Sequence, residues 1–147
     1  MRIGSKGLKL IKDFEGLHLQ AYICPAGVPT IGYGHTRTVS LSDVNSRLTI
    51  AEYTADELLK QDVRFAEIAV YSQLQTLNQN QFDALVSFTF NVGATAFKGS
   101  TLLRKIKSGA PEEEIRYEFS RWNKIGGKSS NGLTRRRQAE ANLYFEK

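Results

Sequence analysis

The spacing of apolar side chains predicts that most of this chain is helical. Near the N-terminus, Leu8, Ile11 and Phe14 recur at intervals of three residues, as on one face of a helix. We expect Ser5 to cap the start of this helix, because a serine hydroxyl can accept a hydrogen bond from the first turn. Gly16 suits its end, since glycine readily adopts the left-handed conformation that terminates helices.

The segment that follows has a different pattern. Residues 17–38 are rich in β-forming residues and glycine, which predicts a small antiparallel sheet with its turn at residues 26–29. Residues 39–52 are polar and irregular, and residues 48–50 have the composition of a further short strand. Thr54 and Glu57 have the spacing of a capping box, which predicts a helix from Thr54 to about Tyr71.

The rest of the chain has helical periodicity. A helix capped by Asn78 or Asn80 and ending near Gly93 is apolar on more than one face, so we expect it to be the buried central helix. Three shorter helices should follow, beginning near Ser100, at Pro111 and at Leu133. The predicted fold is therefore α+β.

We expect one domain, residues 1–147, because this length suits a single hydrophobic core. Within it the pattern predicts three parts, which are an N-terminal α+β lobe (1–53), a linking helix (54–72) and a helical lobe (73–147).

Composition and charge narrow the possible classes of protein. No apolar run reaches the roughly 20 residues that a membrane helix needs, and Lys6, Lys9 and Lys12 argue against a signal peptide. A single cysteine excludes an internal disulfide, and the two histidines lack the spacing of metal ligands. The net charge of +5 favours a polyanionic partner, either nucleic acid or a bacterial envelope rich in phosphate and carboxylate, or is simply a solvated basic surface.

The chemistry is concentrated in Glu15, Cys24 and Thr30, with eight residues between the first two and five between the last two. This spacing and residues 29–36 after it resemble the active-site signature of the phage T4-type lysozymes, the muramidase family of phage endolysins, in its P22-like branch. The family usually has Asp where this chain has Cys24, and a Cys-bearing version also belongs to its pattern. The resemblance continues through residues 81–85, 88–93, 100–103, 122–123 and 132–137, so it covers nearly the whole chain.

This resemblance implies a lysozyme-like fold with a cleft between a small sheet-bearing lobe and a helical lobe. It also implies hydrolysis of the β-1,4 bond between N-acetylmuramic acid and N-acetylglucosamine, with no metal or cofactor. Glu15 would be the general acid. Thr30 would hold a water, and Cys24 would either help position that water or act as a partly ionised base or nucleophile. Direct attack by water inverts the anomeric carbon, whereas attack by the thiolate gives retention, and the sequence leaves both open.

The resemblance also assigns supporting residues. Tyr33, Thr36, Phe90 and Asn91 would contact the glycan, with a place in the core as the alternative for Phe90. His35 would form a structural pair with Asp62 rather than act in catalysis. One residue of the basic cluster Arg135, Arg136 and Arg137 would approach Glu15, with the other two solvated on the helix surface, and the sequence does not say which.

Three other functions compete with hydrolysis. A lytic transglycosylase would need the acid alone, and an inactive module would bind the cell wall without cleaving it. A nucleic-acid binder is the weakest alternative, because no base-reading motif is present. For a hydrolase we expect a monomer that is made in the host cytoplasm and acts on peptidoglycan in the periplasm, without stable membrane insertion. The resemblance implies that a separate hole-forming protein, a holin, releases it.

Overall fold

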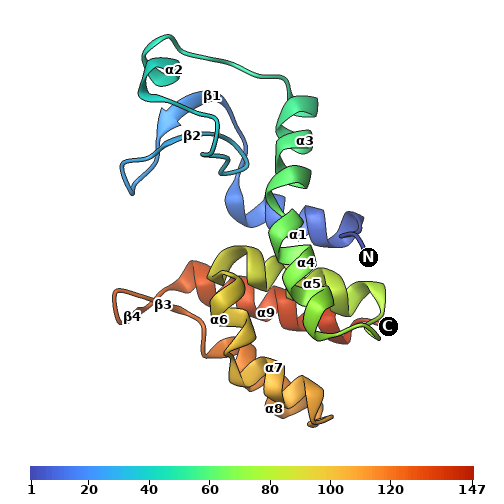
Figure 1. The fold of residues 1–147 in the computed structure, drawn as a ribbon. Coiled ribbons are helices and arrows are strands. Elements are labelled where there is room, and N and C mark those ends of the chain that lie inside the picture. Colours follow the sequence, from blue (N-terminus) through green and yellow to red (C-terminus); the bar gives the residue numbers. More distant parts are fainter. The chain divides into compact units, whose positions relative to one another are not determined.

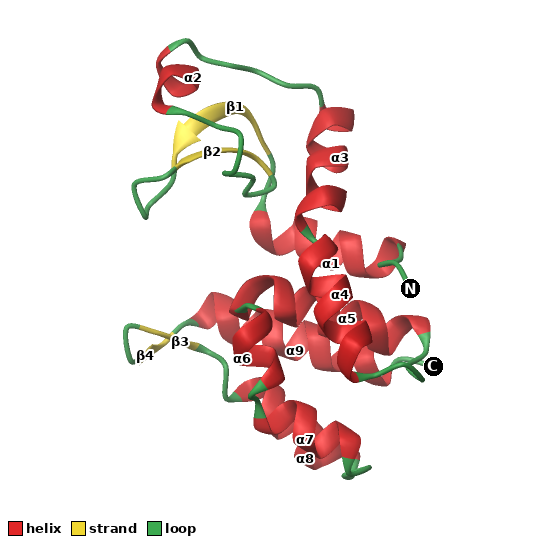
Figure 2. Ribbon diagram, in the orientation of Figure 1, coloured by secondary structure: helices red, strands yellow, loops and turns green.

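A computed structural model describes residues 1–147 and divides them into two compact units (Figures 1 and 2). One unit comprises Glu15–Arg64, and the other joins Met1–Phe14 to Phe65–Lys147. The chain is rich in helix and has a small antiparallel sheet, so the predicted α+β class is confirmed. The first helix groups with the C-terminal residues, unlike the predicted lobe 1–53. None of the helices is long and apolar enough to cross a membrane.

The unit Glu15–Arg64 is built on a hairpin. It contains β1 (His18–Ile23), β2 (Pro29–Gly32), α2 (Leu41–Asn45) and α3 (Glu52–Asp62). β1 pairs antiparallel with β2, and an isolated bridge joins Gln20 to Thr49, which confirms the sheet and the strand-like character of residues 48–50. The sequence pattern missed α2, whose capping box is formed by Ser40 and Asp43.

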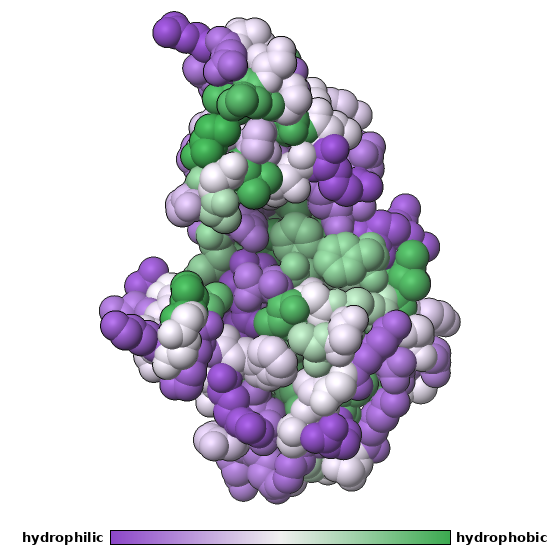
Figure 3. Space-filling view, turned by 60° about the vertical axis from the view of Figure 1, so that its left-hand side comes forward, coloured by the Kyte–Doolittle hydropathy of each residue, from purple (hydrophilic) through white to green (hydrophobic).

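The hairpin depends on α3 for support, because a two-stranded sheet is barely stable by itself in water. In β1 only Ala21 is buried, and in β2 Ile31 is 2% exposed. A Cβ atom placed on Gly32 would lie 3.4 Å from the Cβ of Ala55, so β2 packs directly on α3. The other side of the hairpin is less covered, and apolar atoms reach the surface of this unit in the upper part of Figure 3.

The helix predicted from Thr54 to Tyr71 needs two corrections. It begins at Glu52 after an N-cap at Ala51, so the capping box at Thr54 is wrong. A glutamate in the first turn complements the helix dipole and suits a start without a side-chain cap. The helix also ends at the C-cap Val63, and a second helix, α4 (Arg64–Gln73), follows.

The larger unit is a helical assembly around one buried helix. Its elements are α1 (Ser5–Glu15, whose last residue belongs to the other unit), α4, α5 (Gln79–Val92), α6 (Ala94–Lys98), α7 (Thr101–Lys107), α8 (Glu112–Ser120), β3 (Lys124–Ile125), β4 (Lys128–Ser129) and α9 (Asn131–Phe145). Every residue from 82 to 89 is buried, which confirms α5 as the central helix, and α9 packs along it (Figure 1). Ser100 caps α7 as predicted, and of the two residues predicted as the cap of α5 it is Asn78 that serves.

The core of this unit is an aromatic cluster on α5. The ring of Phe88 contacts Phe97, Phe119 and Trp122 edge to face, with centroids 6.4, 5.7 and 5.5 Å away. Rings prefer this arrangement because their positive edges meet negative faces.

The start of α1 is held by carboxylates from two other helices. Asp83 accepts hydrogen bonds from the backbone N–H groups of Gly4 (2.9 Å) and Gly7 (3.1 Å), and Glu67 accepts one from Ile3 (2.6 Å). A Cβ atom on Gly7 would lie 2.7 Å from the Cβ of Asp83, so only glycine allows this approach. Asp83 thus caps the helix, whereas Ser5 is its first residue and not its cap.

We predict that Asp83→Ala lowers the free energy of unfolding by about 3 kcal/mol, because two backbone donors at a buried helix end lose a charged acceptor. The matched control is Asp13→Ala, which removes an exposed carboxylate of α1 that is paired with Lys9 and should change stability by less than about 0.5 kcal/mol. Urea denaturation measures both. Equal effects of the two substitutions would contradict the capping role of Asp83.

Candidate functional site

The hairpin turn brings Cys24 and Thr30 together. Cys24 directly follows β1, and its N–H donates to the carbonyl of Val28 at 3.0 Å. The hydroxyl of Thr30 donates to the same carbonyl at 2.8 Å. Thr30 lies opposite Tyr22 in the register and is buried. A sulfur and a hydroxyl that are six positions apart in sequence therefore share one end of the hairpin.

The environment of Cys24 favours its thiolate. The backbone of Val28 and, next, the polar side chain of Thr30 lower the pKa of the Cys24 thiol, against a smaller opposing effect of burial. The thiol is free and partly exposed. Because the thiolate is the reactive form of cysteine, this sulfur is better suited to accept a proton or attack carbon than an ordinary thiol is.

Glu15 lies beside a turn that requires glycine. Residues 31–35 form this turn, closed by reciprocal backbone hydrogen bonds of 2.9 Å between Ile31 and His35. Gly34 has a φ of +78°, and a Cβ atom there would lie 3.7 Å from Oε2 of Glu15. The Glu15 carboxylate therefore lies beside this turn. The positive φ values of Gly32 (+67°) and Gly34 (+78°) explain the Gly-Tyr-Gly sequence at residues 32–34.

Tyr22 belongs to the same region, although sequence reasoning did not select it. Burial raises the pKa of its phenol, and the negative charges of Cys24 and Glu15 raise it further. The phenol is therefore close enough to sense both groups. The ring of His18 stacks on it with a centroid distance of 4.2 Å. The hairpin register, which places Tyr22 opposite Thr30, is the only signal that would have identified it.

His35 and Asp62 lie in direct contact. Nδ1 of His35 is 2.8 Å from Oδ2 of Asp62, and since a carboxylate only accepts, the proton is on this nitrogen. Nε2 is 2.6 Å from the hydroxyl of Thr38. Arg37 donates to the other oxygen of Asp62 at 3.2 Å. Both nitrogens of a buried imidazole are thus occupied by protein groups, which suits a structural role.

The expected glycan contacts are divided between the two units. Tyr33 is only 6% exposed, so its ring offers little surface, whereas Thr36 is exposed. In the larger unit Phe90 is half-buried with its ring 6.2 Å from Phe65, and Asn91 is exposed. Substrate binding by these four residues stays a prediction.

The arginine cluster differs from expectation. Only Arg135 is exposed, while Arg136 and Arg137 are buried, so the prediction of two solvated arginines is wrong. Both pair with the buried Glu140, through contacts of 3.3 and 3.2 Å. Burial raises the pKa of Glu140, whereas the charges of Arg137 and Arg136 oppose that shift. Ser87 adds a hydrogen bond of 2.6 Å to the same carboxylate.

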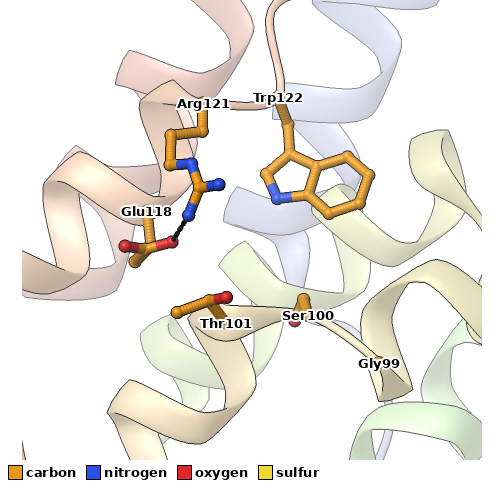
Figure 4. Close-up of a pocket in the computed structure, with 6 residues that line it drawn as sticks. All are labelled: Gly99, Ser100, Thr101, Glu118, Arg121 and Trp122. Atoms are coloured by element: carbon orange, nitrogen blue, oxygen red, sulfur yellow. Dashed lines mark hydrogen bonds and ion pairs between the residues drawn. The ribbon is translucent and has the colours of Figure 1, made fainter.

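A separate recess lies between α7 and α8 in the larger unit (Figure 4). It has a volume of about 300 Å³ and is lined by Gly99, Ser100, Thr101, Glu118, Arg121 and Trp122. Arg121 donates to Glu118 at 2.9 Å across one side, and the indole of Trp122 forms another. An aromatic face beside charged hydrogen-bonding groups is a surface on which polar ring compounds can bind.

Comparison with known proteins gives consistent results. The phage lysozyme family model matches residues 12–140. The chain is 42% identical to the endolysin of Acyrthosiphon pisum secondary endosymbiont phage 1, over 98% of both chains. It is also 42% identical to the endolysin of Salmonella phage P22, over 96% of this chain and 97% of that protein.

A solved structure is also similar to this chain. The muramidase domain of SpmX from Asticaccaulis excentricus superimposes with a TM-score of 0.86 at 37% identity, over 99% of each chain. The range matched by the phage lysozyme family model includes Glu15, Cys24 and Thr30. The chain therefore belongs to the phage lysozyme family.

Proposed function

We propose that this protein is an endolysin that hydrolyses the β-1,4 bond between N-acetylmuramic acid and N-acetylglucosamine in bacterial peptidoglycan and so lyses the host cell. The observation that carries the proposal is the grouping of Glu15, Cys24 and Thr30 on one hairpin region of a phage lysozyme. The family relation supports the substrate class. The grouping supports acid–base chemistry on a glycosidic bond.

In the proposed reaction Glu15 gives its proton to the leaving glycosidic oxygen as the bond from that oxygen to C1 breaks. A water held by the Thr30 hydroxyl attacks C1 from the opposite face. The water's proton passes to the thiolate of Cys24, and the lowered pKa makes this thiolate more accessible than that of an ordinary thiol. Cys24 takes the place that Asp usually has in this family.

The supporting residues follow from the same proposal. Thr36, Phe90, Asn91 and the small exposed part of Tyr33 contact the sugars, and the pair of His35 with Asp62 keeps the turn beside Glu15 in place. The enzyme is made in the host cytoplasm as a monomer and reaches the periplasmic wall after a holin opens the inner membrane. Lytic transglycosylation and wall binding without cleavage remain the competing functions.

We predict that Glu15→Gln lowers lysis of outer-membrane-stripped bacteria at least 100-fold, because general acid catalysis typically contributes about 10²–10⁴-fold. Cys24→Ala should reduce the rate less, and Cys24→Asp should retain activity. Asp13→Asn, an exposed change on the same helix as Glu15, is the control. A turbidity assay measures all four, and full activity of Glu15→Gln would overturn the proposed function.

We also predict that alkylation of Cys24 by iodoacetamide follows a pKa below that of an ordinary thiol. Thr30→Val should move this pKa upward, because it removes a polar side chain that helps to lower it. Thr49→Val, which removes an exposed hydroxyl bonded to the Arg47 carbonyl, should leave it unchanged. The rate of alkylation as a function of pH gives each value. An unchanged pKa in Thr30→Val would show that Thr30 does not act on the sulfur.

The stereochemistry of the product identifies the attacking group. We predict that proton NMR detects the α-anomer first, because direct attack by water inverts a β-linked carbon. Initial β-anomer would instead indicate a covalent intermediate on the Cys24 sulfur. An anhydro sugar in the products, detected by mass spectrometry, would indicate transglycosylation and contradict hydrolysis.

A further inference from the structure

The larger unit contains a buried charged network that the reaction above does not use. Glu140 is wholly buried on α9 and receives hydrogen bonds or ion pairs from Ser87, Arg136 and Arg137. Buried charges are rare unless they are paired and serve a purpose, because removing them from water is unfavourable. We therefore consider which side chain this network holds in place.

Arg137 is the member that reaches Asn91. Nε of Arg137 lies 3.2 Å from Oε1 of Glu140, and the guanidinium lies over the ring of Phe88, 5.0 Å from its centroid. The ion pair and the ring contact hold the planar guanidinium between Glu140 and Phe88. From there Nη2 donates a hydrogen bond to Oδ1 of Asn91, in the last turn of α5.

This hydrogen bond determines which way the Asn91 amide points. Arginine has only N–H donors, so the amide oxygen must face Arg137. The Asn91 NH₂ group then points away from the network, and it makes no hydrogen bond within the protein. The positive charge of Arg137 draws electrons from the oxygen and makes the N–H groups better donors. An exposed side chain is thereby held as a donor of fixed direction.

We infer that Arg137 and Glu140 are positioning residues that present the Asn91 NH₂ group to an acceptor oxygen of the glycan, namely the carbonyl oxygen of an N-acetyl group. The inference rests on the proposed function and deepens it. It makes Asn91 a determinant of specificity, because a free amino sugar carries an ammonium group, which can only donate hydrogen bonds. The site then distinguishes N-acetylated from de-N-acetylated glycan strands.

The test compares two substrates, fully N-acetylated peptidoglycan strands and the same strands after chemical de-N-acetylation. The protein should prefer the acetylated strands through a lower KM. Asn91→Asp keeps the size and the contact with Arg137 but replaces both donors with an acceptor. We expect it to raise KM for acetylated strands about tenfold, the effect of losing roughly one hydrogen bond, and to lower KM for de-N-acetylated strands, with little change in kcat.

Arg137→Lys and Glu140→Gln should each reduce the preference for acetylated over de-N-acetylated strands. Neither should add to the effect of Asn91→Asp in a double variant. A purely structural role would change stability without reversing substrate preference. Gln138→Glu, an exposed amide-to-acid change on the same helix, is the matched control. If Arg137→Lys or Glu140→Gln fails to fold, Asn91→Asp alone decides, since Asn91 is exposed.

Binding measured in the Glu15→Gln background separates this inference from the proposed function. If the unaltered protein cleaves no glycan, the proposed function fails. If it cleaves and Asn91→Asp keeps the original preference between the two strands, only the inference is overturned. A reversed preference, with Kd values for the two strands changing in opposite directions, supports it.

Discussion

The hydrogen bond from His35 to Asp62 is the interaction on which the candidate catalytic region depends. A two-stranded hairpin has too little buried surface to hold its shape, so it must be attached to a helix. Here a polar contact adds to the packing of β2 on α3, because one nitrogen of the buried His35 imidazole joins the turn to Asp62 of α3 and the other is bonded to Thr38. Loss of Asp62 would leave a buried donor without a partner, which is costly in any protein interior. Residues outside the proposed catalytic trio thus hold the turn beside which Glu15 lies.

Much of the fold could be predicted because local rules and tertiary packing agree. The helix around Phe82–Thr89 is apolar on several faces, and only a central position can satisfy it. Caps at Asn78 and Ser100 follow from side-chain chemistry alone. Prediction failed at Thr54 and at Ser5, where hydroxyls sit in cap-like patterns but are not used. In the second case the acceptor comes from Asp83, 78 positions later in the sequence, which no local pattern reveals.

Those parts of the candidate site could be predicted whose residues have a characteristic spacing in the sequence. Glu15, Cys24 and Thr30 were selected by their separation, whereas Tyr22 emerged only from the strand register. In the arginine cluster, by contrast, the sequence did not predict which residues are buried. Three consecutive charged residues are usually exposed to solvent. Arg136 and Arg137 are nevertheless buried, because Glu140, four and three positions away respectively, supplies their counter-charge. Helical spacing of opposite charges was present in the sequence, but it does not say which face is inside.

The anchoring of α1 has a mechanical consequence. Its 11 residues form a stiff rod, about 16 Å long at the usual rise of an α-helix. One end is clamped by Asp83 and Glu67, and the other end carries Glu15. A fusion partner or affinity tag attached ahead of Arg2 therefore adjoins this clamp directly. One attached after Lys147 also lies beside the first turn of α1, because Lys6 pairs with Glu146.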